Sequence, residues 1–308
     1  MATTLFTSSA GVFRGNLHGH STHSDGKNSP DEAVRLYRAA GYDFTCLSEH
    51  FWSNRRFCAS TIMDSTAFDT ADFITIISAE LHCPGKAYDR DGLWHVVANG
   101  LPMDFPMATE TETGPELVAR AVAAGAYVTI AHPEWYSLTD EEARSLAAAG
   151  AHGVEIYNHS SVIKAARGGG IATLDLLLHE GHRVHATATD DSHDVPDDAF
   201  GGWVMVAAES LTATDIVAAL KAGRFYASSG PDFTELTFDG TTLHVETWPV
   251  ERIILAADRH RALSVTGDGL TSASFDLSSL DTDFFRVVAT DAQGRSAWTN
   301  PYWMDDLR

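Results

Sequence analysis

The chain has 308 residues, which is long enough for one large domain with a smaller domain beside it. Hydrophobic residues make up 44% and charged residues 20%, as is ordinary for globular proteins. The 42 acidic residues outnumber the 21 basic ones and give a formal net charge of −21, which disfavours binding to the phosphate backbone of nucleic acids.

Up to about residue 230, short β-rich runs alternate with helical segments. The first helix has a clear start, because Ser29 can cap it and Pro30 suits its first turn. The expected helices cover residues 30–40, 115–124, 139–149, 171–180 and 213–222, and the expected strands cover 42–48, 73–79, 126–131, 153–157, 183–189 and 203–207. This alternation predicts an α/β fold with a parallel sheet that closes into a barrel.

From about residue 231 the pattern changes to β-rich segments separated by glycine-containing turns. These segments cover residues 233–238, 242–246, 252–256, 272–277 and 284–290. They predict a small all-β, sandwich-like domain. We place the boundary at Ser228-Ser229-Gly230-Pro231, which divides the chain into residues 1–230 and 231–308.

The segment NLHGHSTHSDG at residues 16–26 holds three histidines and an aspartate within eight positions. On an extended strand, His18 and His20 point to the same face because side chains alternate with a period of two. Two neutral imidazoles with a carboxylate close by suit a borderline divalent metal ion. We expect His23, between them and Asp25, to be a bystander.

Further histidines and acids follow the ends of predicted strands, where barrels of this kind carry their reactive groups. His95 is the exception, because it precedes a β-like run, and we expect His82 to be a bystander. The candidate metal ligands are His18, His20, Asp25, His50, Glu80, His95, His132, Asp191 and His193. Nine nitrogen and oxygen donors without cysteine predict two or three divalent ions of Zn, Mn or Fe, and a carboxylate such as Glu80 can bridge two of them.

These motifs resemble, in order, those of the PHP (polymerase and histidinol phosphatase) family of metal-dependent phosphoesterases. The matching segments are 18–26 (HGHSTHSDG), 47–50 (LSEH), 78–81 (SAEL), 95–100 (HVVANG), 130–133 (IAHP) and 191–193 (DSH). The sequence departs from the family pattern at Glu49, which replaces an aspartate, and at Ser78, which replaces a glycine. The resemblance covers residues 12–230 and implies a distorted (β/α)₇ barrel.

The resemblance also implies how the ligands divide among three ions. The first set is His18, His20, Glu80 and Asp191, the second is Glu80, His95 and His132, and the third is Asp25, His50 and His193. The implied chemistry is hydrolysis of a phosphate ester by a metal-bound hydroxide at a di- or trinuclear site, with Asp191 as the catalytic proton acceptor. Residues 220–231 and 291–301 resemble a PHP branch with an appended β-domain, which includes carbamate (carbaryl-type) hydrolases.

Three further residues, Asn158, His159 and Arg167, lie on a predicted loop that faces the proposed site and could bind an anionic group of the substrate; solvated surface residues are the alternative. The aromatic residues Trp94 and Trp135 could line the pocket with Tyr136, or pack in the core.

We expect a hydrolase that cleaves a small phosphorylated metabolite. Hydrolysis of a carbamate or carboxylic ester at the same site is one alternative, and an inactive metal-binding or interaction protein is another. The three cysteines, Cys46, Cys58 and Cys83, have no CxxC spacing, and no secretory signal or bilayer-spanning apolar run is recognised. We therefore expect a cytoplasmic protein with a small-molecule substrate and with neither nucleic-acid nor membrane partners.

Overall fold

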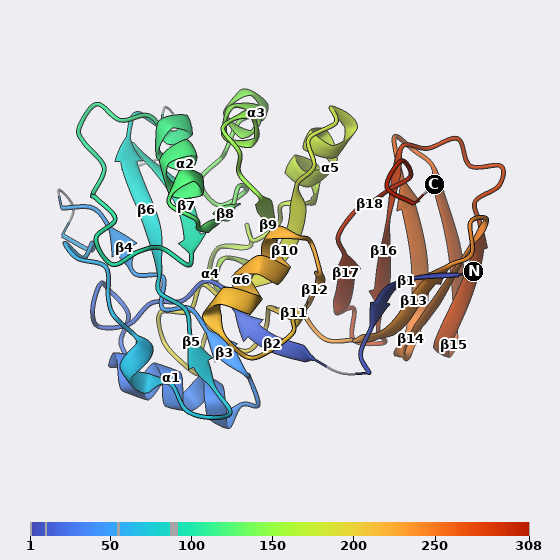
Figure 1. The fold of residues 1–308 in the computed structure, drawn as a ribbon, viewed down its shortest axis with the longest axis horizontal. Coiled ribbons are helices and arrows are strands. Elements are labelled where there is room, and N and C mark those ends of the chain that lie inside the picture. Colours follow the sequence, from blue (N-terminus) through green and yellow to red (C-terminus); the bar gives the residue numbers. More distant parts are fainter. Residues whose placement is uncertain (1, 10, 54–55, 87–91, 308) are drawn as a thin grey trace.

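The computed structural model describes residues 2–9, 11–53, 56–86 and 92–307. Within these ranges the chain forms a mixed α/β structure with six α-helices, one 3₁₀ turn and two β-sheets (Figure 1). The helices are α1 (Pro30–Ala39), α2 (Gly114–Ala123), α3 (Asp140–Ala148), α4 (His159–Ala165), α5 (Ile171–His179) and α6 (Ala213–Lys221), and the 3₁₀ turn is Thr66–Phe68.

The strands before residue 230 are β1 (Thr3–Thr7), β2 (Val12–Asn16), β3 (Phe44–Thr45), β4 (His50–Phe51), β5 (Ile74–Thr75), β6 (Ser78–Pro84), β7 (Leu93–Asn99), β8 (Tyr127–Ile130), β9 (Gly153–Asn158), β10 (His185–Thr189), β11 (Trp203–Ala207) and β12 (Phe225–Ser228). Those after it are β13 (Phe233–Phe238), β14 (Thr242–Ala257), β15 (Ala262–Asp276), β16 (Phe284–Thr290), β17 (Ser296–Thr299) and β18 (Tyr302–Trp303). Residues 231–307 contain no α-helix, as the predicted all-β region requires.

Helix α1 begins at Pro30 as expected, but the expectation that Ser29 caps it is wrong, because the Ser29 hydroxyl donates to Asp31 and makes no capping hydrogen bond. Helices α2 and α3 each begin with a capping box, in which Thr113 pairs with Glu116 and Thr139 pairs with Glu142. Helix α4 was not predicted. It covers part of the segment that the sequence assigned to a loop, and the Asn158 side chain caps it by accepting a hydrogen bond from the backbone N–H of Ser161 at 2.9 Å.

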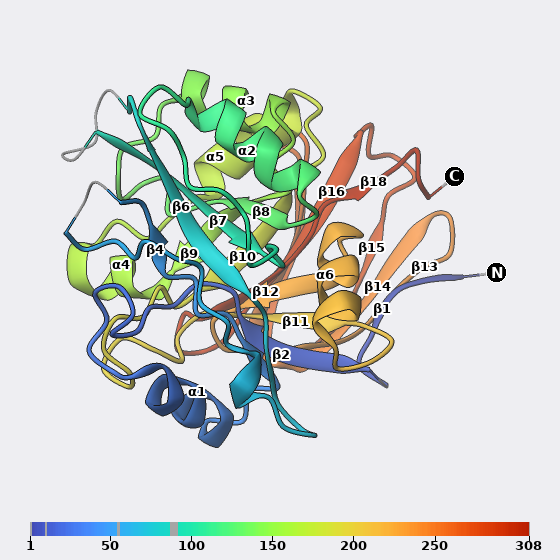
Figure 2. The same ribbon diagram turned by 60° about the vertical axis from the view of Figure 1, so that its left-hand side comes forward.

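One sheet has the order β10-β9-β8-β7-β6-β4. Helix α2 packs on β6, β7 and β8, and α5 packs on β9; Figure 2 shows α2, α3 and α5 together on one face. The expectation of parallel strands throughout is wrong for β7, which is antiparallel to both β6 and β8, and for β11 in the other sheet, which is antiparallel to both β2 and β12. Eight residues separate β6 from β7, too few for a parallel crossover, which needs a dozen or more.

The other sheet runs from the N-terminal region into the C-terminal region. Its order is β1-β13-β14-β16-β17-β12-β11-β2-β3-β5, with β15 paired to β14 and β18 to β16. Strand β1, at the start of the chain, pairs with β13 near its end. The domain boundary at residue 230 stays a prediction. The hydrogen bonds of the described residues thus divide the strands between two sheets, without one continuous closed barrel.

The C-terminal strands bury a core of their own. The first half of β14 pairs with β13 and its second half with β16, and side chains of both halves, such as Leu243 and Leu255, belong to one buried cluster. Phe284 instead joins the core beneath the β6–β9 strands. Beside it, Arg286 on β16 donates a hydrogen bond to Asp175 on α5 at 2.9 Å, so apolar packing and an ion pair join the two regions.

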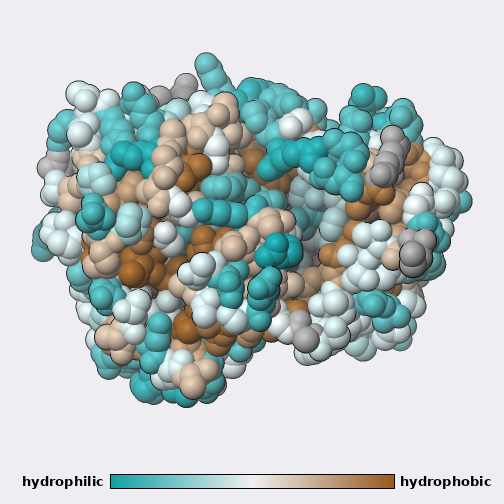
Figure 3. Space-filling model, viewed as in Figure 1, coloured by the Kyte–Doolittle hydropathy of each residue, from teal (hydrophilic) through white to brown (hydrophobic). Residues whose placement is uncertain are grey.

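The surface shown in Figure 3 is mainly hydrophilic to neutral, and its hydrophobic side chains lie in small separate patches. Among the described residues, no helix combines the length and the apolar character needed to cross a membrane.

Candidate metal centre

The nine candidate ligands lie at one end of the α/β region. On β4 and β6, His50 and Glu80 are directly paired in parallel register. His95 pairs with His82 across β6 and β7, and because β7 runs antiparallel, the start of β7 lies beside the ends of its neighbours. This accounts for the position of His95, which precedes its β-like run. The expectation that the other candidates follow strand ends holds for His132 and Asp191, but it is wrong for His50, which begins β4, and for Glu80, which is the third residue of β6.

A backbone bridge joins the two loops that carry the first and the last ligands. The N–H of His20 donates to the Ser192 carbonyl at 2.8 Å, and the N–H of Asp191 donates to the His18 carbonyl at 2.9 Å. Residues 18–20, after β2, therefore lie against residues 191–193, after β10. Asp191 has a φ of +51°, a left-handed conformation that is rare for a residue with a side chain and is often found at functional sites.

Glu80 lies at the centre of the deep part of the site and is fully buried. Its Oε1 is 2.8 Å from Nδ1 of His95 and 3.1 Å from Nε2 of His132. Its Oε2 is 3.5 Å from Nε2 of His18 and 3.7 Å from Nε2 of His20. Three groups of potential ligands share this carboxylate: one with His18 and His20, one with His95 and His132, and one with His50 and His82.

Asp191 adds a second carboxylate to the deep part. Its Oδ1 is 3.0 Å from Nε2 of His20 and 3.2 Å from Nε2 of His18, and it forms a further group with His18 and His132. Its Oδ2 accepts a hydrogen bond from Asn158 at 3.1 Å. Glu80 and Asp191 thus face His18 and His20 together.

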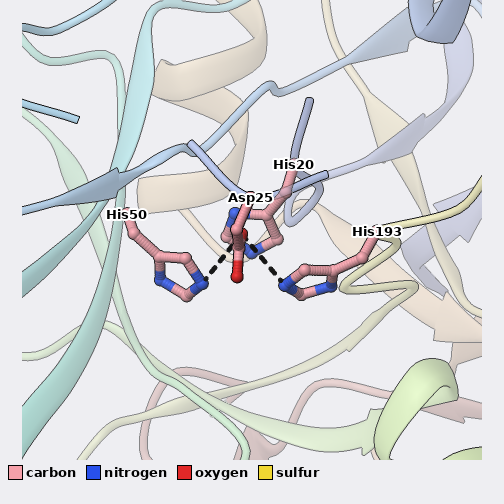
Figure 4. A group of neighbouring side chains, drawn as sticks. All are labelled: His20, Asp25, His50 and His193. Carbon is pink, nitrogen blue, oxygen red and sulfur yellow. Dashed lines mark ion pairs between the residues drawn. The ribbon is translucent and has the colours of Figure 1, made fainter. Parts of the chain in front are cut away.

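A separate, outer group consists of His20, Asp25, His50 and His193 (Figure 4). Asp25 lies between the rings of His50 and His193, and its Oδ1 is 3.5 Å from Nε2 of each. The side chain of Asp25 is 33% exposed and that of His193 is 27% exposed, whereas Glu80 is inaccessible to solvent. The outer group therefore opens toward solvent.

The second ligand set that the family resemblance implies is one of these groups, and the third lies within the outer group, which also contains His20. The first set is divided between the group of His18, His20 and Glu80 and the group that contains Asp191. The structure brings all nine candidates together, and their role as ligands stays a prediction.

The carboxylates of the deep part are held in their charged form. Burial alone would raise the pKa of Glu80, but the rings of His50 and His82 hold it well below its usual range. Burial opposes the ionisation of Asp191 in the same way, and His18 and His20 nevertheless lower its pKa well below normal. Both groups are therefore carboxylates at neutral pH.

The histidines are shifted in opposite directions by their neighbours. Burial works against protonation of His18, but Asp191 and Glu155 raise its pKa well above the usual value. Burial lowers the pKa of His20 well below normal, and His193 and His50 lower it further. Strong opposite shifts within one cluster are typical of functional sites.

The donor atoms fit bound metal ions. Nε2 of His18 and Oε2 of Glu80 are buried without a hydrogen-bond partner, although they face each other at 3.5 Å. Unsatisfied buried polar atoms are costly, and a cation between them would satisfy both. Nδ1 of His18 donates to Glu155 and Nδ1 of His193 donates to the Asp191 carbonyl, which leaves Nε2 of each ring as the available ligand atom.

Glu155 is a site residue that the sequence analysis missed. It is fully buried on β9, and its Oε1 accepts hydrogen bonds from His18 at 2.7 Å and from Thr189 at 2.9 Å. Its Oε2 accepts from the backbone N–H of His132 at 2.8 Å and from Asn158 at 3.0 Å. A lone acid inside an otherwise apolar strand was the available signal.

The two expected bystanders differ in position. His23 is exposed and contacts the Thr61 carbonyl at 3.1 Å. His82 is fully buried, with Nε2 at 2.8 Å from Nδ1 of His50 and at 3.7 Å from Oε2 of Glu80. His82, His50 and Glu80 together form one of the groups of potential ligands.

A pocket of about 220 Å³ opens onto the cluster. It is lined by Asp25, His50, Phe57, His95, His132, Trp135, Asp191 and His193. Trp135 is 41% exposed and packs against His132 and His95, whereas Trp94 and Tyr136 are buried and do not line it.

The predicted substrate-binding residues lie outside this lining. Asn158 is fully buried and contacts Asp191, His159 is half-buried beside Tyr157, and Arg167 is exposed after α4. Their predicted role in substrate binding gains no support from this arrangement.

No family model and no curated protein matches the sequence. Among solved structures, the chain is similar to a two-domain protein from Bacteroides vulgatus that contains a predicted PHP-like metal-dependent phosphoesterase. The two share 16% identity with a TM-score of 0.56, over 98% of this chain and 97% of the other. This likeness shows that the chain has the fold of that two-domain, PHP-like protein, as the motifs predicted.

Two further likenesses are partial. A protein from Bifidobacterium adolescentis with a predicted assignment as a metal-dependent phosphoesterase shares 16% identity and a TM-score of 0.42, over 58% of this chain and 87% of its own. An amidohydrolase from Chromobacterium violaceum, with bound sulfate and no metal, shares 15% identity and a TM-score of 0.46, over 60% and 89%.

Proposed function

We propose that this protein is a metal-dependent hydrolase that cleaves phosphate esters of small metabolites. The observation that carries the proposal is the buried cluster around Glu80, in which carboxylates and imidazoles converge at the base of a pocket. A pocket of about 220 Å³ suits a small substrate group rather than a macromolecule.

The proposed ligand sets are those that the family resemblance implies, with two or three divalent ions of Zn, Mn or Fe. An all nitrogen and oxygen donor set favours these metals. Bound divalent ions at such a site supply Lewis-acid polarisation of an ester oxygen and activation of water. The strands that surround the cluster would form the distorted barrel of this family; the bridge between Gly19 and Ser192 supports closure at that point.

Asp191 is the proposed proton acceptor. Its carboxylate borders the pocket, and Asn158 fixes one of its oxygens by a hydrogen bond at 3.1 Å. Its lowered pKa keeps it ionised at neutral pH but also makes it a weak base, so proton transfer from an attacking water molecule would depend on the bound ions making that water more acidic.

Hydrolysis of a carbamate or carboxylic ester is the second candidate. It is favoured by the pocket wall, where Phe57 and Trp135 offer apolar surface. Among the described residues, no lysine or arginine lines the pocket, so a phosphate dianion would depend on the ions and histidines for charge neutralisation.

The test compares two substrates and two variants. The full chain, loaded in turn with Zn²⁺, Mn²⁺ or Fe²⁺, is assayed on p-nitrophenyl phosphate and on p-nitrophenyl acetate. We expect metal-dependent hydrolysis of the phosphate and a loss of at least about 100-fold in kcat for Asp191→Asn, as for a general base. Asp268→Asn, an exposed aspartate on β15, is the matched control and should retain activity.

Turnover of the acetate without turnover of the phosphate would support the ester hydrolase instead. Bound metal with no turnover of either substrate would support the third possibility, an inactive metal-binding protein.

A further inference from the structure

His82 is the one buried histidine of the cluster that the proposed ligand sets do not use. It lies two residues after Glu80 on β6, so both side chains point to the same face of the strand. The ring is fully buried, and Phe57 packs edge-on against both His82 and His50. A buried imidazole at this position needs a partner for each ring nitrogen.

The backbone fixes which nitrogen of His82 carries the proton. Nδ1 of His82 is 2.9 Å from the carbonyl oxygen of Trp94. A carbonyl oxygen can only accept a hydrogen bond, so Nδ1 must donate. In the neutral ring, Nε2 then has a lone pair and must accept.

That lone pair fixes the tautomer of His50 in turn. Nε2 of His82 is 2.8 Å from Nδ1 of His50, so Nδ1 of His50 carries the hydrogen and donates it. Oε2 of Glu80 lies 2.6 Å from the same nitrogen as a close charged contact without hydrogen-bond geometry, and a hydrogen on Nδ1 suits this carboxylate better than a second lone pair would. Nε2 of His50 is left with its lone pair, and this is the atom that faces Asp25 in the outer group.

We propose that His82 is a positioning residue. Its Nδ1 donates to the Trp94 carbonyl, its Nε2 accepts from Nδ1 of His50, and Nε2 of His50 is thereby left able to bind a metal ion in the outer group. This inference rests on the proposed function, because it takes the outer group to be a metal site. The same logic holds for His18 and His193, whose Nδ1 atoms donate to Glu155 and to the Asp191 carbonyl. Such partners change metal affinity by about 10- to 100-fold.

Glu80 does not make His82 redundant. Its two oxygens already face His18, His95 and His132, and the proposed sites engage both of them. Once Glu80 is engaged in this way, His82 is the acceptor that remains for Nδ1 of His50.

The first experiment measures the tautomer itself in the metal-free full chain. Nitrogen-15 NMR, at a pH where the ring is neutral, should show His50 with its hydrogen on Nδ1, with the signals assigned by comparison with His50→Gln. A hydrogen on Nε2 of His50 would overturn the proposal. This readout does not depend on metal binding, so a hydrogen on Nε2 would overturn the proposal even if the chain binds no metal and the proposed function fails.

The second experiment measures metal affinity in a matched pair of variants by titration with Zn²⁺ against a chromophoric chelator. His82→Leu removes the acceptor, and we expect one equivalent of Zn²⁺ to bind 10- to 100-fold more weakly. His82→Gln places a carbonyl oxygen near the position of Nε2 and should restore most of that affinity. Equal affinities in the wild type and His82→Leu would overturn the proposal, as would a Zn²⁺ ion held between His50 and His82.

Discussion

Two groups of histidines lie at opposite ends of the same strands. At one end, His132 follows β8 and lies within 3.1 Å of the Glu80 carboxylate. At the other end, His152 and His185 pack against Tyr127, the first residue of β8, with ring centroids 5.3 and 6.2 Å away. Among the described residues, no carboxylate lies within ion-pair distance of either of these two rings.

The difference in neighbours gives the two groups different electrostatics. Burial and the nearby Lys221 lower the pKa of His152 to about 4, and burial and His152 lower that of His185 to about 4. At the candidate metal centre, acids raise the pKa of His18 and His132 in spite of burial, although the pKa of His20 is lowered there as well. Buried acids, and not the number of imidazoles, distinguish a potential metal centre from a group of core histidines.

Removing the central acid should have the largest effect. Glu80→Gln keeps the shape of the side chain but removes the charge that faces His18, His95 and His132. We expect loss of the deep ions and a fall in activity of about 10³-fold, which corresponds to several kcal/mol of lost transition-state stabilisation. Metal content by elemental analysis and the rate of phosphate ester hydrolysis measure the effect.

The exposed Glu110→Gln provides the control for Glu80→Gln and should match the wild type in both measurements. Wild-type metal content in Glu80→Gln would show that the imidazoles suffice, and would break the distinction between the two histidine groups.

Glu155→Gln should have a smaller effect, because Glu155 acts through His18. All the partners of its two oxygens are donors, which include His18 at 2.7 Å and the backbone N–H of His132 at 2.8 Å. An amide in its place must turn its NH₂ group toward one of these donors. We expect metal affinity to fall by 10- to 100-fold, measured by competition with a chromophoric chelator.

An unchanged affinity in Glu155→Gln would mean that His18 keeps its orientation without the buried charge. Glu110→Gln again serves as the control for the loss of one carboxylate.

From the sequence, the candidate site residues could be predicted more readily than the contacts that hold them in place. The candidate ligands could be proposed because their motifs occur in a fixed order along the chain, although His50 and Glu80 lie within strands and do not follow them. The position of His95 was also predictable in principle, since the short connection before β7 excludes a parallel crossover. The assumption that all strands are parallel hid that signal.

The supporting contacts are tertiary, and no local pattern encodes them. Glu155 and His18 are 137 residues apart, and β1 pairs with β13, more than 200 residues away in the chain. Helix α4 has only seven residues, and its one start signal, Asn158, was interpreted as a loop residue that faces the substrate. The distance between such partners along the chain explains why motif order predicts the ligands and not their neighbours.

The smallest expected effect concerns the second histidine group, and it appears in stability rather than in activity. The pKa of His152 is about 4 in the folded protein and about 6.5 in the unfolded chain. Between these two pH values, His152 is neutral in the folded protein but protonated in the unfolded chain. Its contribution to stability is therefore complete above pH 6.5 and is lost as the pH falls toward 4. One such group changes the free energy of unfolding by at most about 1.4 kcal/mol per pH unit, and solvent screening at this half-buried ring reduces that value.

His152→Asn tests this difference, because asparagine can keep the acceptor that Nδ1 offers to the backbone N–H of Val128 at 3.0 Å but cannot be protonated. Denaturant unfolding at pH 7, 6 and 5 should show a shallower loss of stability in the variant than in the wild type. The exposed His260→Asn should leave the wild-type slope unchanged. Equal slopes in His152→Asn and the wild type would mean that His152 is protonated in the folded protein too. The absence of nearby acids would then not distinguish this group from the candidate metal centre.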